Sequence, residues 1–459
     1  MAQSAATPRP EPDDYALPEG LSTRLREAVE ANARAEAAAL VADLHVADLA
    51  DLIEQMPAGL RRAFLDLSWD DLDQDFVVEL EESTRDQVLA ELGPERVAQA
   101  ARELDSDDVV YLLEDLDEGD QEAVLEALDP VDRVAVSRSL TYPEYSAGRL
   151  MQSEFVRAPA FWTVGQMIDA LRASEDLPAQ FYDIIVVDPA MRPVGKVALS
   201  SILGAPRPVV LSSLMDEDFR TLSVLDKQED VAYAFNQYHL VSCPVIDDDG
   251  RCVGVITIDD AMVALDQEAE EDIKRLGGVG DEEISEGLMA VTRQRFPWLG
   301  VNLLTAIIAS LVIALFDDVI TEVVALAVLM PIVASMGGNA GTQTLTVAVR
   351  ALATRDLTAA NMGRIVVREL GVGLLNGVLF AVVMGLIAWG WFADITLGWV
   401  IAVAMVVNLG VAGLAGILIP IGLDKVGADP ALASGTFVTT VTDVVGFFAF
   451  LGLAALVLL

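Results

Sequence analysis

The chain has 459 residues, a formal net charge of −42 and 53% hydrophobic residues, but only two cysteines and two histidines. So few thiols and imidazoles argue against a disulfide scaffold or a thiolate metal cluster, and the acidity argues against a nucleic-acid partner, because phosphates are bound by clustered Lys and Arg. The acidity favours cation attraction and a surface adapted to high salt about equally.

The N-terminal third predicts a tail followed by helices. Residues 1–20, "MAQSAATPRPEPDDYALPEG", are polar and Pro-rich, which is typical of a disordered tail and not of a signal peptide. From 21 to 140, apolar residues recur at spacings of three and four between acidic turns, as in "DDVVYLLEDLD" and "QEAVLEALDPVDRVAVSRSL". This pattern predicts an all-α superhelical N-terminal domain of short stacked helices.

An internal repeat follows. "VVDPAMRPVGKVALSSIL" (186–203) matches "VIDDDGRCVGVITIDDAM" (245–262) at an offset of 59 residues, which superposes Gly195 on Gly254. Each copy reads as strand, tight turn, strand and helix, with Gly250 as a turn residue. We therefore predict two related α/β domains, at residues 141–210 and 211–262.

A charged helical connector is expected at 263–294, interrupted by glycines at 277, 278 and 280. Residues 296–459 then carry only nine acidic and five basic side chains, so nearly all the net charge precedes them. They contain five apolar stretches long enough to span a bilayer, at 298–316, 323–349, 370–393, 395–423 and 430–459. The sequence thus predicts a multidomain membrane protein with a five-helix transmembrane domain at 295–459.

The basic residues of the loops predict the orientation of these spans. Arg293 and Arg295 precede the first span, four arginines separate the second from the third, and Lys425 separates the fourth from the fifth. The two remaining loops, "DDVITE" and "WFADIT", carry no basic residue. By the positive-inside rule the N-terminal domains are cytoplasmic and Leu459 is external, in a multi-pass protein of the cell membrane.

One acid, Asp443, lies inside the last span. Thr436, Thr439 and Thr440 precede it by seven, four and three residues, so their hydroxyls share its helical face. Intramembrane acids are costly and usually functional. Such oxygens suit a hydrated Mg²⁺, held by one carboxylate per subunit about a two-fold axis. The alternative is a protonated Asp that seals a helix interface.

The second span contains "PIVASMGGNAGTQTLTV", with polar Asn339 and Gln343 one turn apart. We expect this segment to line an aqueous path and to be partly unwound, with exposed backbone carbonyls. Gly337 and Gly341 also form a GxxxG motif, so close helix packing is the alternative explanation.

The soluble part offers two further candidate sites. Gly254, Thr257 and Asp260 form "GVITIDD", in which the Asp can accept from a ribose hydroxyl, bind a cation or cap a helix. Acidic runs at 105–108 and 268–272 are each typical of a solvated face. If they face one another, a divalent ion can bridge them.

Together these parts resemble the MgtE family of magnesium channels over nearly the whole chain. The resemblance is carried by "LTYPEYSAGRLM" (140–151), "PIVASMGGNAGTQTLTV" (331–347), "DPALASG" and "FVTTVTDVVG" (429–446), and by the order of the domains. It implies that the repeat is a tandem CBS pair, that the channel is a homodimer, and that cytosolic Mg²⁺ between the soluble domains holds the connector in a closed, plug-like position.

The resemblance also implies residue roles. Asp443 matches the pore aspartate, and ATP binds the CBS pair in some members. Tyr111 and His239 stand where the family often has acids, which puts some regulatory sites in doubt. Regulatory Mg²⁺ is expected at Asp107, Asp108, Glu229, Asp260, Glu268, Glu271 and Asp272.

The function we predict is a Mg²⁺-selective, Mg²⁺-gated channel for magnesium uptake and homeostasis. No Walker motif is present to drive transport by ATP. The alternatives are a secondary transporter of divalent cations coupled to H⁺ or Na⁺, with Asp443 as the coupling acid, and a membrane-anchored sensor. No nucleophile with a base is recognisable, so we do not expect an enzyme.

Overall fold

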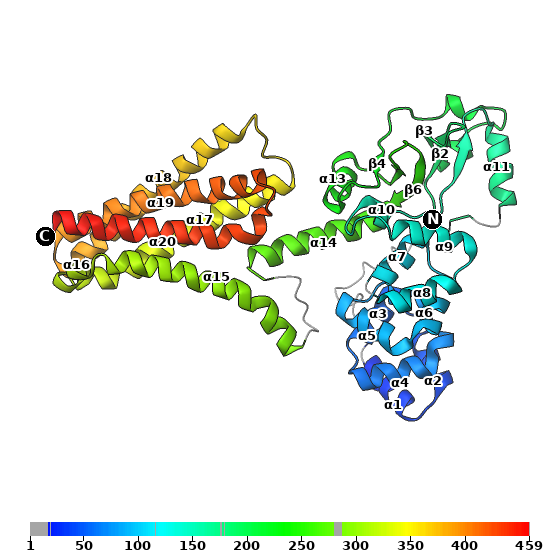
Figure 1. Cartoon of the computed structure of the whole chain (residues 1–459), viewed down its shortest axis with the longest axis horizontal. Coiled ribbons are helices and arrows are strands. Elements are labelled where there is room, and N and C mark those ends of the chain that lie inside the picture. The colour runs from blue at the N-terminus through cyan, green and yellow to red at the C-terminus, as the bar shows by residue number, and fades with distance from the viewer. Residues whose placement is uncertain are drawn as a thin grey trace, which may run out of the picture. The chain divides into compact units, whose positions relative to one another are not determined.

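Figure 1 shows the computed structural model of the chain, which describes residues 17–18, 20–114, 116–174, 177–178, 180–279 and 287–458, without the side chains of 118 and 432–434. Most of the predicted tail and residues 280–286 of the predicted connector lie outside these ranges. The chain divides into two compact units, Met1–Leu265 and Asp266–Leu459.

The first unit begins with a stack of short helices, as predicted (Figure 1). Prolines with their fixed φ begin two of them, Pro94 in α6 and Pro130 in α9. The apolar faces bury a continuous core that includes Phe64, Trp69 and Phe76. The elements are α1 (Leu21–Glu30), α2 (Arg34–Val41), α3 (Val46–Glu54), α4 (Ala58–Ser68), η2 (Trp69–Asp71), η3 (Gln74–Val77), α5 (Glu82–Leu92), α6 (Pro94–Ala100), α7 (Ser106–Glu114), α8 (Glu118–Ala127) and α9 (Pro130–Ser139).

The predicted repeat is confirmed by two three-stranded sheets with the same topology. In each, the first two strands are parallel and the last two antiparallel, and the pairing of Asp183 with Ala198 recurs 59 residues later as Ser242 with Thr257. The elements are α10 (Ala147–Leu150), β1 (Arg157–Pro159), α11 (Val164–Ala173), β2 (Asp183–Val187), β3 (Pro193–Ala198), α12 (Leu199–Gly204), η4 (Leu211–Ser213), β4 (Leu222–Ser223), α13 (Gln228–Tyr238), β5 (Ser242–Ile246) and β6 (Cys252–Thr257).

The two copies exchange their leading segments. Gln152, which precedes the first copy's strands, donates its N–H to Val255 in the second copy at 2.9 Å, and Lys196 in the first copy donates to Asp216 at 3.1 Å. The repeated glycines make this approach possible, because a Cβ at Gly254 would lie 2.7 Å from the Gln152 carbonyl oxygen and one at Gly195 would lie 3.0 Å from that of Asp216. The backbone exchange therefore crosses the predicted boundary at 210/211 in both directions.

The second unit contains five helices that are long and apolar enough to span a membrane. The central one is α19, with 67% of its apolar stretch buried against 6% for α15. Besides the end of α14 (Ile258–Leu276), the described elements are α15 (Leu288–Ala314), α16 (Asp317–Glu322), α17 (Ala325–Ala353), α18 (Met362–Phe392), α19 (Ile395–Lys425) and α20 (Pro430–Val457).

The expectation that the second span is partly unwound is wrong. α17 is one continuous helix from Ala325 to Ala353, although Pro331 lies within it. Its buried glycines are used for packing: a Cβ at Gly341 would lie 2.5 Å from Val438 on α20, and one at Gly416 on α19 would lie 2.6 Å from the Gly341 oxygen. These glycines therefore allow three helices to pack closely while α17 remains helical through the segment.

Candidate functional site: a polar cavity in the membrane unit and an acidic contact in the soluble unit

A polar cavity of about 390 Å³ lies among the membrane helices. It is enclosed by α15, α17, α20 and the C-terminal end of α14. Among the described residues of its wall, Asp443 supplies the one carboxylate. The other described lining residues are Arg275, Leu276, Gly277, Gly278, Asn302, Thr305, Ala306, Thr342, Gly435, Thr436, Thr439 and Thr440. The four residues predicted to share one face of the last span therefore line one cavity.

The threonines of α20 present oxygen atoms rather than protons to this cavity. Thr439 donates its hydroxyl proton to the backbone oxygen of Gly435 at 3.0 Å, and Thr440 donates to that of Thr436 at 2.6 Å. A hydroxyl has one proton and two lone pairs, so each oxygen keeps acceptor capacity for a cation or its water. Helical geometry thus creates a row of neutral acceptors beside the carboxylate.

Two residues of α15 belong to the same cavity and were missed in the sequence. Asn302 accepts a hydrogen bond from the Thr436 hydroxyl at 2.7 Å, which joins α15 to α20, and Thr305 lies one turn further along. Two polar side chains three residues apart in an otherwise apolar span are a signal that could have identified them.

Asn339 and Gln343 were expected to line the aqueous path, but within one chain they do not share a cavity with Asp443. Both are exposed on α17 and neither lines the cavity of Asp443. Asn339 donates to the hydroxyl of Ser335 at 3.4 Å. Together with exposed Thr342, which does line the cavity, they form a polar face on a membrane helix.

The end of α14 is fixed to the start of α20 beside the cavity. Arg275 forms ion pairs with Glu271 on its own helix and with Asp429, which also caps α20 by accepting from Ala431 N at 2.7 Å. Leu276 packs against an apolar cluster of α17 and α20. Of the acids predicted to regulate, Glu271 therefore has an arginine partner, while Glu268 and Asp272 lie nearby on the same helix.

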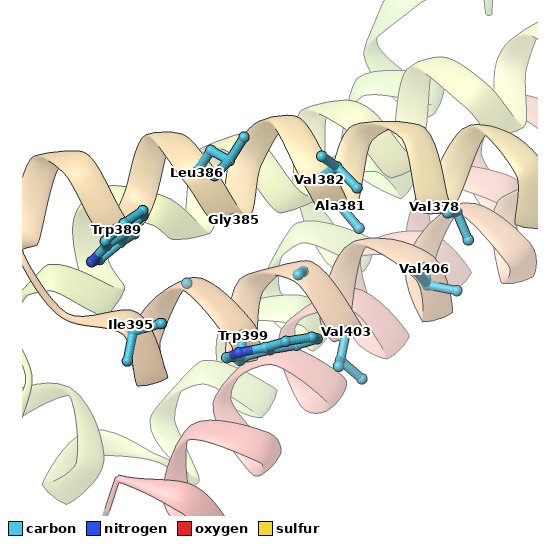
Figure 2. Close-up of a pocket in the computed structure, with 12 residues that line it drawn as sticks. Val378, Ala381, Val382, Gly385, Leu386, Trp389, Ile395, Trp399, Val403 and Val406 are labelled. Carbon is cyan, nitrogen blue, oxygen red and sulfur yellow. The ribbon is translucent and has the colours of Figure 1, made fainter.

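A larger cavity of about 460 Å³, between α18 and α19, has a different character (Figure 2). Its lining is entirely apolar apart from the indole nitrogens of Trp389 and Trp399. It offers no oxygen ligand, so we do not assign it to a cation.

The soluble unit brings three predicted regulatory acids together where α7 meets the start of α14. Burial, then the charge of Asp260, raises the pKa of Asp107 well above its usual range and that of Asp108 to about 7. Burial also raises the pKa of Asp260 to about 6, although Thr257 donates a hydrogen bond to it at 2.7 Å. Asp107 Oδ1 is buried and has no hydrogen-bond partner among the described residues.

This arrangement suits a cation, because a positive charge reduces the repulsion between the carboxylates and provides a partner for Asp107 Oδ1. Among the described residues, no three Asp, Glu, His or Cys side chains are grouped to hold one metal ion directly. Mg²⁺ typically uses one or two carboxylates and retains water, so the pair of Asp107 and Asp260 fits it as a partly hydrated ion. Glu229 is exposed at the start of α13.

The two residues that depart from the family pattern, Tyr111 and His239, have other local surroundings. The ring of Tyr111 stacks on the buried guanidinium of Arg85, with 3.9 Å from the guanidinium carbon to the ring centroid. His239 follows α13 in the left-handed conformation, with φ of 52°. Neither supplies an acid to the contact.

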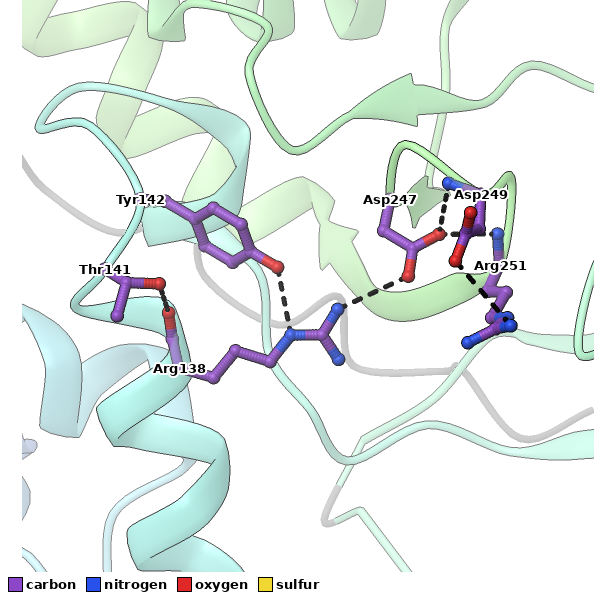
Figure 3. Close-up of polar contacts among 6 residues, drawn as sticks. All are labelled: Arg138, Thr141, Tyr142, Asp247, Asp249 and Arg251. Atoms are coloured by element: carbon purple, nitrogen blue, oxygen red, sulfur yellow. Dashed lines mark hydrogen bonds and ion pairs between the residues drawn. The ribbon is translucent and has the colours of Figure 1, made fainter.

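A second polar contact joins the helical stack to the second CBS-like copy (Figure 3). Arg138 on α9 donates to Asp247 at 3.4 Å and to the Tyr142 hydroxyl at 3.1 Å. Asp247 is held by its own turn, where Asp249 N and Arg251 N donate to it at 3.0 and 2.9 Å.

The predicted nucleotide residues are only partly available. Gly254 is packed against Met151 and Gln152, as described above. Thr257 bonds to Asp260 and to Asp259, and Asp260 also faces Asp107. A ribose at Asp260 would therefore compete with these contacts.

Comparison with known proteins gives consistent matches. Residues 330–453 match the profile of MgtE, divalent cation transporters, residues 44–145 that of the MgtE intracellular N domain, and residues 211–267 that of the CBS domain. The chain is 34% identical over 317 residues to "Magnesium transporter MgtE" of Enterococcus faecalis, which covers 69% of this chain and 70% of that protein.

A relative of the same name from Bacillus subtilis is 30% identical over 418 residues, covering 90% of this chain and 92% of that protein. A solved structure of the cytosolic domain of the Mg²⁺ channel MgtE in complex with ATP is 26% identical, covers 53% of this chain and 100% of that one, and has a TM-score of 0.49.

Proposed function

Because the chain belongs to the MgtE family of magnesium transporters, we propose that it is a Mg²⁺-selective channel, gated by cytosolic Mg²⁺, that mediates magnesium uptake across the cell membrane. The observation that carries this proposal is the cavity in which Asp443 is accompanied by neutral hydroxyl oxygens. Flow follows the membrane potential and the concentration gradient.

The size of the cavity supports passage of a hydrated ion. Six waters at about 30 Å³ each occupy about 180 Å³, which is less than the cavity volume of about 390 Å³. Asp443 neutralises part of the charge, and the threonine oxygens and Asn302 can accept hydrogen bonds from the ion's water shell. Binding through water is weak enough to allow release, which conduction requires.

The exposed polar face of α17 supports a homodimer. Ser335, Asn339, Thr342 and Gln343 are exposed in the single chain on a helix that is apolar enough to span a membrane. Such groups rarely face lipid. A second copy placed across this face would cover it and bring two Asp443 carboxylates to one path about the two-fold axis. Asn339 and Gln343 would then line that path.

Gating is supported by the continuity of α14. One helix carries Asp260 in its first turn and ends at Leu276, in the wall of the cavity. Its 19 residues span about 28 Å at about 1.5 Å per residue. Mg²⁺ at Asp107, Asp108 and Asp260 would hold the start of α14, so the closed position of its end depends on the cytosolic ion.

The remaining assignments are also proposals. Four further acids are candidate regulatory ligands of a dimer, because they are exposed or partly exposed on their own units: Glu229 on α13 and Glu268, Glu271 and Asp272 on α14. ATP is proposed at the second copy through Thr257 and Asp260, in competition with Asp107. The loop arginines support N-terminal domains in the cytoplasm and an external C-terminus.

Conductance of the purified protein in planar bilayers tests the proposal. We expect a macroscopic Mg²⁺ current without a proton or sodium gradient, and its loss in Asp443→Asn. The matched control is Asp394→Asn, which removes an acid that only caps α19. Mg²⁺ movement that requires a proton or sodium gradient would instead establish a secondary transporter, and an unchanged current in Asp443→Asn would remove the pore role of this residue.

A further inference from the structure

A fully buried amide lies at the centre of the membrane unit, outside the cavity described above. Asn408 is in the middle of α19 and has no exposed surface. Its Nδ2 donates to the backbone oxygen of Val333 on α17 at 2.7 Å. Polar side chains on buried faces of membrane helices act as links between helices, because the surroundings offer no water as an alternative partner.

The seat of this amide is made by glycines from two other helices. A Cβ at Gly446 on α20 would lie 2.8 Å from Nδ2 of Asn408, and a Cβ at Gly337 on α17 would collide with the same atom. Any side chain at either position therefore displaces the amide. Asn408 lies at one point where α17, α19 and α20 meet, and these three helices pack on one another (Figure 1).

The amide nitrogen of Asn408 has a hydrogen-bond partner, but the amide oxygen has none among the described residues. Asn408 Oδ1 is buried and accepts no hydrogen bond among the described residues. A buried acceptor without a partner is unfavourable, and such groups in folded proteins call for an explanation beyond packing. A leucine of similar shape would avoid that penalty, so the amide has a use for which its donor is needed.

That use follows from its position between the two helices that carry the predicted ion path. Gly337 lies two residues before Asn339, and Gly446 lies three residues after Asp443. Apolar contacts alone define the axial position of one helix relative to another only poorly. A single buried amide can fix this register. The hydrogen bond to Val333 fixes the axial position of α17 relative to α19. The close approach of Gly446 to the amide fixes the axial position of α20 relative to both helices.

We propose that Asn408 is a positioning residue of the ion path, which fixes the height of α17 relative to α20 and thereby the spacing between Asn339 and Asp443 oxygens. This inference rests on the proposed channel function. Misplacement of the oxygen-bearing helices weakens recognition of the hydrated ion more than it weakens folding, because hydrogen bonds to the water shell depend on distance and angle.

The test measures Mg²⁺ and Co²⁺ influx into liposomes that contain the full-length protein, together with its melting temperature in detergent. Asn408→Leu keeps the approximate shape and removes the donor. We expect its half-saturating Mg²⁺ concentration to rise about tenfold or more, with a changed ratio of Co²⁺ to Mg²⁺ influx. The control is Ile401→Ala, which creates a cavity at a buried position of the same helix two turns earlier. It is expected to lower the melting temperature without changing that ratio.

A second variant approaches the same seat from α20 and does not alter Asn408 itself. Gly446→Ala should displace the amide and reproduce the changed ratio, whereas Gly452→Ala should not, because its Cβ would meet only Phe316 at 3.8 Å. If Asn408→Leu and Gly446→Ala keep the wild-type ratio and half-saturation while Asp443→Asn abolishes influx, Asn408 only packs the bundle and the inference is overturned. If Asp443→Asn transports normally, the proposed function fails and the inference with it.

Discussion

The acidic contact of the soluble unit and the cavity of the membrane unit both present aspartate oxygens, but they surround them differently. Asp107, Asp108 and Asp260 are crowded and largely buried. Burial raises the pKa of all three, and the charge of Asp260 raises the pKa of Asp107 and Asp108 further. Asp443 has threonine hydroxyls as neighbours instead of further acids. Crowded carboxylates favour ion retention, whereas a single carboxylate with neutral oxygens favours release. This difference agrees with the roles proposed for the two sites, a Mg²⁺ sensor in the soluble unit and an ion path in the membrane unit.

Adding an acid to the cavity of the membrane unit should have the largest effect, because it makes the cavity resemble the crowded acidic contact. Thr440→Asp would place a second carboxylate three residues before Asp443, and we expect tighter retention of Mg²⁺ and about tenfold slower influx, equivalent to about 1.4 kcal/mol. Thr440→Asn, with a neutral side chain of the same size, is the control in the same liposome assay. Faster influx in Thr440→Asp than in Thr440→Asn would contradict the explanation.

Removing acids from the acidic contact of the soluble unit tests whether the crowded carboxylates bind the ion. In the double variant Asp107→Asn with Asp108→Asn, we expect the Mg²⁺ concentration that protects the connector from limited proteolysis to rise about tenfold, because the cation has less charge to neutralise. The double variant Asp43→Asn with Asp51→Asn removes the same number of carboxyl groups from exposed positions of the helical stack. Equal midpoints in the two double variants would show that the contact does not bind the ion.

The same contact should respond to pH. With pKa values of about 7 for Asp108 and about 6 for Asp260, raised by burial, these groups hold protons more tightly in the folded contact than when separated. Without Mg²⁺ the contact is therefore most stable at acidic pH, and this stability is lost as the pH rises through 6 to 7.

If Mg²⁺ binds at this contact as proposed, protons and Mg²⁺ compete for the same oxygens. Between pH 8 and pH 6 we expect the protecting Mg²⁺ concentration to rise by up to about tenfold per competing proton and pH unit. The measurement is connector proteolysis at several pH values, with Asp107→Asn and Asp108→Asn together as the control that should flatten the profile. A wild-type midpoint independent of pH would contradict the assignment.

The smallest effect is expected at the other contact of the helical stack. Arg138 and Asp247 pair at 3.4 Å, with the arginine side chain 49% exposed. Solvent screens such a pair, so Arg138→Gln should change the free energy of unfolding by less than about 1 kcal/mol and should leave the Mg²⁺ midpoint unchanged. A shifted midpoint would mean that this contact, too, is part of the sensor.

Much of the membrane unit could be predicted because its signals are local. The length of the apolar stretches and the spacing of Thr436, Thr439, Thr440 and Asp443 depend only on helical geometry. The unwound second span was a wrong prediction because glycines are ambiguous in sequence: only their neighbours show that Gly337 and Gly341 are used for packing. Asn302 and Thr305 were overlooked in an apolar span, although Thr436, the partner of Asn302, was identified.

From the sequence alone we could infer which segments face water or lipid, the repeat at 59 residues, the face shared by Asp443 and its threonines, and the family. These properties follow from periodicity and composition along the chain. The tertiary structure decided which groups meet: Asp107 with Asp260, Asn302 with Thr436, and Asn408 with Val333 between two glycines. Such pairs join residues far apart in the chain, and their contact depends on how whole helices pack, which no local pattern records.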